Sequence, residues 1–247
     1  MTPEQIEALE RIADRGWPAR ERASLGRWIL NAADGWSGRL NACWPLGPEP
    51  EDLPAAIDAV EAWYADRGLP PLFKPAIETP GLMAQWISRG YAPRTETLMM
   101  TADIPLVVAP ARVTVLDEAD AAFETVFVGT QAEPADAAER IEAFRRLPSP
   151  RLFARIMGSE GPAAIGAAVV EGDWVGIFGM RTLAGQRRQG LARDIVAALL
   201  SGARAHGARR AYLQVEAGNG PAIALYESFG FSVAYAYRYW ARGASAA

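Results

Sequence analysis

The segment 185–194, which reads GQRRQGLARD, places three arginines and two glycines together in a chain whose net charge is −4. It follows a strand-like run and precedes an amphipathic helical run. A helix that begins after a glycine turn leaves its first backbone N–H groups without intrahelical partners, and they face one point together with the positive end of the helix dipole. Gly190 lets an anion approach the backbone, and Ala192 keeps the first turn small. The segment predicts a phosphate site, and the alternative is an ordinary turn on an arginine-rich surface.

The residue content excludes several other kinds of catalytic and binding site. The chain has one cysteine, Cys43, one histidine, His206, and one lysine, Lys74. A disulfide framework, a zinc site of Cys and His ligands, and a catalytic unit with a histidine base need more of these residues, or need His206 itself. Since His206 lies near the end of a predicted helix, we expect it to face solvent there. We also expect no metal site.

Length, charge and hydropathy limit the class of protein. With 247 residues and 50% hydrophobic content, the chain can bury one large core or two ordinary ones. A net charge of −4 gives no general attraction to nucleic acid or to an anionic membrane, so we expect neither as a partner. No window approaches the ~18 apolar residues of a membrane span, and residues 1–16 predict a polar amphipathic helix. We expect a cytoplasmic protein that is a monomer or a homodimer.

Beyond residue 111, strand-like and helix-like segments alternate in the order β-α-α-β-β-β-α-β-α-β. Alternation of apolar residues predicts strands, and apolar residues every three or four positions predict helices. Short turns between the three central strand segments predict an antiparallel meander. The predicted strands are 112–117, 151–158, 163–171, 174–183, 210–218 and 234–241, and the predicted helices are 119–129, 134–146, 191–207 and 221–230.

Two segments of this part resemble the signatures of one enzyme family. Residues 187–192, RRQGLA, resemble the Gln/Arg-x-x-Gly-x-Gly/Ala signature of the GCN5-related N-acetyltransferases, or GNAT enzymes. Residues 213–231 resemble the second signature of that family, with Asn219 opening the last helix and Tyr226 in its middle. The resemblance covers about 112–247, and the order of strands and helices is also that of the family.

The resemblance implies a binding site for acetyl-CoA, with CoA as the product. In this family the fourth and fifth strands splay apart, and the pantetheine arm pairs with the exposed backbone, here at Met180 to Leu183. The pyrophosphate would bind the backbone amides of Arg187 to Arg193, Asn219 would contact the pantetheine, and Tyr226 would lie near the thioester sulfur. Ala184 stands where many relatives have proline, and this change removes no amide donor. The implied cofactor-binding residues are Met180, Thr182, Arg187, Arg188, Gln189, Gly190, Leu191, Ala192, Arg193, Asn219 and Tyr226.

Acetyl transfer to an amine also needs proton transfer. At pH 7, deprotonating a lysine-like amine of pKa about 10.4 costs roughly 4 to 5 kcal/mol, so a base or a water relay is useful. Glu216, at the end of the strand YLQVE, is the candidate base, and Glu171 and Asp173 are its rivals. Tyr226 is the candidate acid for the departing thiolate, because its hydroxyl is a donor at neutral pH. The alternative for Tyr226 is an aromatic residue that only packs under the last helix.

The first hundred residues resemble a second, degenerate copy of the same unit. Aligning Gly90 with Gly230 places Thr79 on Asn219, and the helix and strand of 55–77 then parallel those of the later copy. At the same offset, the counterpart of Gly190 is Pro50, with carboxylates at Glu49, Glu51 and Asp52. Proline removes an amide donor, and carboxylates repel phosphate. We therefore expect this copy not to bind CoA in the usual way.

The segment GWSGRLNACWP contains Arg39 and Asn41 in a pattern similar to that of bacterial two-domain GNAT proteins. These two side chains either help to define an acceptor pocket, with Glu171 as a further substrate candidate, or only bind loop carbonyls. The predicted fold class is α/β (α+β): a tandem GNAT fold with a mixed, mostly antiparallel sheet whose central strands splay and whose faces carry helices. A degenerate domain at 1–104 and a catalytic domain at 110–247 would be joined by a linker at about 102–111.

The predicted function is N-acetyl transfer from acetyl-CoA to a primary amine of a small molecule or a protein. The alternative is a CoA-binding or regulatory module that performs no transfer.

Overall fold

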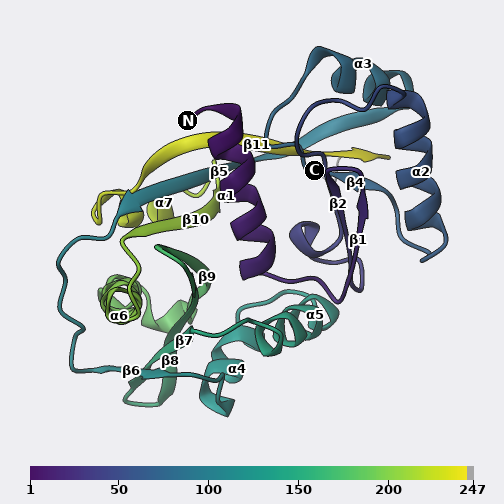
Figure 1. Cartoon of the computed structure of the whole chain (residues 1–247). Coiled ribbons are helices and arrows are strands. Elements are labelled where there is room, and N and C mark those ends of the chain that lie inside the picture. Colours follow the sequence, from purple (N-terminus) through teal and green to yellow (C-terminus); the bar gives the residue numbers. More distant parts are fainter. Residues whose placement is uncertain (244–247) are drawn as a thin grey trace. The chain divides into compact units, whose positions relative to one another are not determined.

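The computed structural model describes residues 1–243 and divides the chain into two units (Figure 1). Unit 1 consists of Met1–Leu98, Glu216–Gly218 and the residues from Tyr235 onward. Unit 2 consists of Met99–Val215 and Asn219–Ala234. Contiguous boundaries at 1–104 and 110–247 stay a prediction.

The elements of unit 2 follow the order expected from the sequence. The segments with apolar alternation are strands, and each predicted helix forms within a few residues of its expected bounds. The elements are β6 (Val113–Leu116), α4 (Ala121–Val128), α5 (Pro134–Arg145), β7 (Arg151–Gly158), β8 (Gly161–Glu171), β9 (Trp174–Thr182), α6 (Leu191–Ala205), β10 (Arg210–Glu216), α7 (Gly220–Glu227) and β11 (Ser232–Arg242).

Strands β6 to β9 form the antiparallel meander, and β10 pairs with β9 in parallel. Helix α6 covers one face of these strands, and α4 and α5 cover the other (Figure 1). The apolar side of α6 packs closely because Gly166 has no side chain. A Cβ at Gly166 would lie 2.7 Å from Ile195 and 3.2 Å from Leu199. The mixed, mostly antiparallel sheet with helices on its faces is confirmed.

A bulge and an early end to strand pairing open β9 at its C-terminal end. The register between β8 and β9 shifts opposite Gly166, where Gly179 adopts φ +59°. A side chain there would also collide with Phe144, whose ring lies 2.3 Å from the position of a Cβ. The parallel pairing with β10 ends at Ile177 and Leu213, although β9 continues to Thr182. The two central strands therefore separate, as expected.

Unit 1 repeats this plan, with strands β3 and β4 of only two residues each. Its elements are α1 (Pro3–Gly16), β1 (Glu21–Leu25), β2 (Trp28–Ala32), β3 (Cys43–Trp44), α2 (Leu53–Ala65), β4 (Leu72–Phe73), α3 (Pro80–Ser88) and β5 (Tyr91–Asp103). The strand order within the unit is β1-β2-β3-β4-β11-β5. As with β9 and β10, the parallel neighbours β3 and β4 are joined by a helix.

Helices α3 and α7 are equivalent in the two copies. The side chains of Thr79 and Asn219, which the offset of the repeat aligns, both cap these helices, and each helix leads into a long strand. Each of these last strands contributes to both units: β5 enters unit 2 at Met99, and β11 enters unit 1 at Tyr235. In unit 1, Trp240 of β11 pairs with Phe73 of β4. The final strand of the second repeat thus completes the sheet of the first unit.

A buried ion pair lies within unit 1. Lys74 and Glu10 are both 0% exposed and form a salt bridge. The Lys74 ammonium lies 3.9 Å from the ring centroid of Trp44 and 4.1 Å from that of Tyr237, and Glu10 also accepts a hydrogen bond of 2.6 Å from the Tyr235 hydroxyl. Burial lowers the pKa of Lys74, and Glu10 opposes that change.

No helix among residues 1–243 is long and apolar enough to cross a membrane.

Candidate functional site

The N-terminus of α6 presents free backbone amides, as the sequence predicted. Gly190 is the N-cap residue with φ +75°, and no side chain caps the helix. The first intrahelical bond at this end runs from the Asp194 amide to the Gly190 carbonyl. Within residues 1–243, the amides of Leu191, Ala192 and Arg193 have no backbone or side-chain acceptor. By contrast, the Asn219 side chain caps α7. Only α6 of these two helices has its first amides available for an anion.

The loop before α6 has an unusual backbone. Arg188 adopts φ +65° and is, within the described part of the chain, the only residue other than glycine with a positive φ. Arg188 and Gly190 therefore both turn left-handed next to the helix start. Successive amides in such a turn form an anion-binding concavity. The strain of a left-handed arginine is typical of backbone held for a functional purpose.

The three loop arginines are not equivalent. The Arg187 Nε group donates to the Thr182 carbonyl at 3.5 Å, so Arg187 remains beside the end of β9. Arg193 donates to the Ser228 hydroxyl at 2.8 Å and lies over the Phe229 ring. The guanidinium of Arg193 thus connects α6 to the end of α7, and its contribution to anion binding would come through its backbone amide. The Gln189 side chain binds Gln186 at 3.4 Å.

Arg112 is a fourth arginine at this site, and it was not among the residues predicted from the sequence. Its guanidinium pairs with Asp194 and donates to the Gln189 carbonyl at 3.3 Å. Its Nη2 atom lies 3.8 Å from the position that a Cβ on Gly190 would occupy. Arg112 is about 80 residues from the loop in the chain, and no local pattern connects the two. It places a positive charge directly beside the free amides.

The splayed end of β9 presents backbone groups on its open side. The Leu183 amide donates to Ala163 of the β8 side, so the groups of Thr182 and Met180 point away from β8, because backbone direction alternates along a strand. The carbonyls of Met180 and Thr182 accept from the side chains of Arg181 and Arg187. Met180 and Thr182 therefore lie at the open edge where the resemblance placed the pantetheine arm.

Tyr226 lies on α7 and is 7% exposed. Burial raises its pKa to about 12, and the charge of Arg181 partly opposes that rise. Its ring packs 6.0 Å from the ring of Phe231, centroid to centroid. Its hydroxyl makes no hydrogen bond with any residue of the part that the structure describes. The hydroxyl is thus a protonated donor at neutral pH, and its side chain also packs as a core residue.

Two of the three candidate bases lie at the wrong end of β9 for the splay. Glu171 ends β8 and pairs with Trp174 at the start of β9. Asp173 lies in the same turn and forms a salt bridge with Arg210. The nine residues of β9 separate this turn from the splayed end, about 27–30 Å at the usual rise of a strand. Glu216 instead ends β10, the strand that leaves β9 at the splay.

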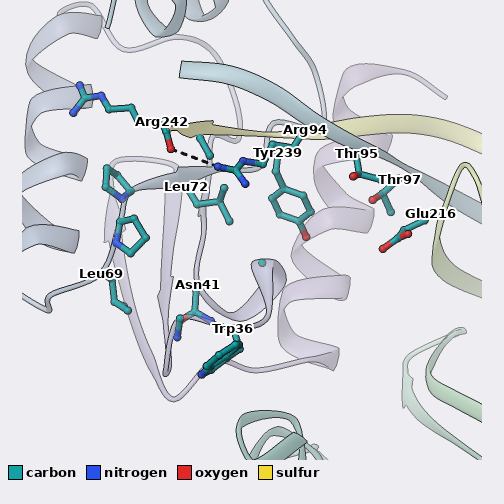
Figure 2. Close-up of a pocket in the computed structure, with 15 residues that line it drawn as sticks. Trp36, Asn41, Leu69, Leu72, Arg94, Thr95, Thr97, Glu216, Tyr239 and Arg242 are labelled. Atoms are coloured by element: carbon teal, nitrogen blue, oxygen red, sulfur yellow. Dashed lines mark hydrogen bonds between the residues drawn. The ribbon is translucent and has the colours of Figure 1, made fainter. Parts of the chain in front are cut away.

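A cavity of about 390 Å³ in unit 1, here called the unit 1 pocket, contains Glu216 and Asn41 (Figure 2). Asn41 accepts the amides of Ala33 and Gly35 at 2.7 and 3.0 Å and donates to the Ser37 carbonyl at 2.9 Å. Its polar atoms therefore hold the loop that forms one wall. Arg39 does not line the pocket but lies 5.5 Å from the ring centroid of Trp17.

The equivalent of the arginine loop in unit 1 is filled by carboxylates. Asp52 caps α2 by accepting the Ala55 amide at 3.0 Å. Glu49 accepts the Thr79 hydroxyl and the Leu82 amide at the N-terminus of α3. At the start of α2, the Ala55 amide is therefore already bound to an acidic side chain, and Pro54 has no amide hydrogen to offer a phosphate.

Comparisons with known proteins match the chain to a family of acetyltransferases. The sequence model of the family described as "Probable histone acetyltransferase Rv0428c C-terminal" matches residues 3–240. The chain is 27% identical, over 237 residues, to the "Uncharacterized N-acetyltransferase YobR" of Bacillus subtilis (strain 168), covering 93% of this chain and 95% of that protein.

Two solved structures are similar in fold. A GCN5-related N-acetyltransferase from Kribbella flavida aligns with a TM-score of 0.69 and 18% identity over 99% of this chain and 96% of its own. A tandem GNAT protein from the clavulanic acid biosynthesis pathway aligns with a TM-score of 0.62 and 12% identity over 97% and 88% of the two chains. The tandem GNAT fold predicted from the sequence is confirmed.

Proposed function

The chain belongs to the acetyltransferase family described as probable histone acetyltransferase Rv0428c C-terminal, and on that premise we propose that it transfers the acetyl group of acetyl-CoA to a primary amine. Unit 2 binds the donor in this proposal. The residues of unit 2 fit acetyl-CoA. Its pyrophosphate needs amide donors and positive charge, and its acyl-pantetheine arm needs an open strand edge.

One observation carries the proposal. The free amides at the start of α6 and the open edge of β9 occur at the same end of one strand-loop-helix segment, with only 183–190 between them. A phosphate bound by Leu191, Ala192 and Arg193 would leave the attached arm close to Thr182 and Met180. Arg188, Arg187 and Arg112 would balance the negative charge of the phosphates. An ordinary strand-to-helix turn has no need of this combination.

Glu216 is the proposed general base. It ends β10 and lies in the unit 1 pocket, where it forms no salt bridge or hydrogen bond with the side chains of the described residues. An amine arrives as an ammonium ion, and its nitrogen cannot attack until one proton has left. Glu216 accepts that proton directly or through a water molecule and releases it to solvent.

Tyr226 is the proposed donor to sulfur. Bound acetyl-CoA supplies a thioester, whose C–S bond breaks as the C–N bond to the acceptor forms. Tyr226 holds its proton at neutral pH, since its pKa is raised to about 12, and its hydroxyl donates to the sulfur as negative charge develops there. The new amide nitrogen loses a second proton, which returns through Tyr226 or water to the thiolate. The products are the acetylated amine and CoA as a free thiol.

The alternative is a module of the same fold that binds CoA without transferring the acetyl group. The experiment that separates the two incubates the pure protein with acetyl-CoA and a panel of amines, and measures free thiol together with the mass of the acceptor. Thiol release that depends on an amine, with a gain of one acetyl group on that amine, supports transfer. CoA binding without amine-dependent thiol release across the panel would favour the binding module.

A further inference from the structure

The unit 1 pocket has a mixed lining, and all of its residues belong to unit 1. Apolar walls come from the loop before β4 and from an aromatic residue, Trp36, that is 48% exposed. A volume of about 390 Å³ suits a small molecule and not a folded protein. The lining residues are Gly35, Trp36, Gly38, Asn41, Leu69, Pro70, Pro71, Leu72, Arg94, Thr95, Thr97, Glu216, Tyr239, Ala241 and Arg242.

Three charged residues belong to this lining, and the side chain of one of them is already engaged elsewhere. Arg242 forms a salt bridge with Glu61 and donates to the Arg89 carbonyl. Its contribution to the pocket is a backbone carbonyl, which accepts a long bond of 3.4 Å from Arg94 (Figure 2). The remaining charges are the guanidinium of Arg94 and the carboxylate of Glu216.

Neither of these two groups has a counter-ion among the residues that the structure describes. Among residues 1–243, Arg94 forms no salt bridge, and its bond to the Arg242 carbonyl uses one of five N–H groups. Glu216 likewise pairs with no cation. Arginine with acidic partners is common elsewhere in unit 1, for example at Arg67 and Arg89. One free cation and one free anion thus share a pocket whose other walls are largely apolar.

The two charges lie at different ends of the pocket. The Ala217 amide donates to the Glu96 carbonyl, which places Glu216 beside Thr97 of β5. Arg94 is three residues away from Thr97 along the same strand, about 10 Å at the usual rise. In the view of Figure 2, the Tyr239 ring lies between Arg94 on one side and Glu216 with Thr97 on the other. A ligand that meets both charges must carry its own charges apart.

We propose that the unit 1 pocket binds the amine acceptor, and that this acceptor is a small molecule with a primary amine at one end and a carboxylate at the other. This inference rests on the proposed function, because Glu216 meets the amine as its base. Arg94 forms a charge-assisted pair with the carboxylate, and the apolar walls hold the chain between the two groups.

The experiment measures kcat/KM for acetyl transfer to ω-amino acids of three to eight carbons and to the n-alkylamines of equal length. We expect the best ω-amino acid to exceed its alkylamine by roughly 10- to 100-fold, the usual effect of one hydrogen-bonded charge pair. Arg94→Met should reduce that ratio to about 1, whereas Arg94→Lys should restore part of it. Arg11→Met, which removes a half-exposed arginine of α1, is the matched control and should keep the wild-type ratio.

The outcomes separate this inference from the proposed function. If acetyl transfer occurs but alkylamines or lysine peptides match the ω-amino acids, or if Arg94→Met keeps the ratio, the acceptor class is refuted and acetyl transfer stands. If no amine is acetylated, calorimetry with 6-aminohexanoate tests binding alone. If 6-aminohexanoate binds to the wild type and not to Arg94→Met, the ligand class of the pocket stands and the proposed acetyl transfer is refuted. Absence of both transfer and binding overturns the inference. Thermal unfolding of each variant verifies that it is folded.

Discussion

Replacing Gly190 with aspartate tests the cofactor site at its most exposed point. The N-cap position of a helix is where an aspartate oxygen accepts the amides of the second or third helical residue, here Ala192 and Arg193. The added Cβ has room, because its nearest neighbour is Arg112 Nη2 at 3.8 Å. The variant would therefore fold with its own carboxylate on the donors that the pyrophosphate needs.

The expected size of the effect follows from these donors. Hydrogen bonds to a charged group contribute about 1.5–3 kcal/mol each, so losing two of them costs roughly 3–6 kcal/mol of binding free energy. That range corresponds to about a 10²- to 10⁴-fold rise in Kd for CoA. The effect on the stability of the fold is much smaller. A left-handed aspartate at φ +75° costs ~1–2 kcal/mol, and the hydrogen bonds that its side chain makes as a helix cap return a few tenths to about 1 kcal/mol.

Calorimetric titration with CoA measures the change, and Gly172→Asp is the matched control. Gly172 has φ +60° and nothing within 4 Å of an added Cβ, and it lies in the turn at the opposite end of β9. Gly172→Asp therefore adds the same charge, with a similar backbone strain, at a position that is not near α6. Wild-type affinity in Gly190→Asp would refute the amide site. An equal loss in both variants would show that charge or strain in general, and not the position, causes the effect.

Four further predictions concern the acid, its pH dependence, the core and the stoichiometry. Tyr226→Phe should lower kcat by at least tenfold with little change in the Kd of CoA. An unchanged rate of thiol release in stopped-flow experiments would show that Tyr226 is only a packing residue. Because the pKa of Tyr226 is raised to about 12, the hydroxyl keeps its proton below that pH. Loss of this proton should therefore cause no fall in kcat between pH 7 and 10. If kcat falls in that range in the wild type and not in Tyr226→Phe, this prediction is contradicted. Glu10→Gln should lower the free energy of unfolding, measured in urea, by about 3–5 kcal/mol, because it leaves Lys74 buried without a counter-charge. The double variant Glu10→Gln with Lys74→Met should recover much of that loss. A loss below about 1 kcal/mol in the single variant would show that the pair is not buried as described. One CoA should bind per chain, since carboxylates fill the loop around Pro50, and a second equivalent that a change at Pro50 abolishes would overturn this.

Local features of the sequence were sufficient for the elements of unit 2. Apolar alternation identified β7, β8 and β9, and the spacing of apolar residues identified α6. The arginine loop was identified for the same reason: amides left free at a helix start depend only on the residues next to that start. The repeat in the first hundred residues was also visible, because Thr79 and Asn219 cap equivalent helices by the same local chemistry.

Two further features of the site have a signal in the local sequence. Gly179 stands inside a strand pattern, which is a signal for a bulge, and the bulge accompanies the splayed end of β9. Glu171 and Asp173 precede β9, whereas the arginine loop follows it, so their separation could have been estimated from the length of the strand.

Tertiary structure alone decided the arrangement of residues that are distant in the chain. Strand β4 has two residues and therefore no periodicity to show, and its partner in β11 lies about 168 residues later. Arg112 reaches Gln189 and Asp194 across about 80 residues, and Arg94 shares its pocket with Glu216, about 120 residues away. The buried contact of Glu10 with Lys74 and Tyr235 is of the same kind. Helix caps and hydrophobic periods depend on neighbours within a few residues, whereas such contacts depend on the packing of the whole unit, which no local pattern specifies.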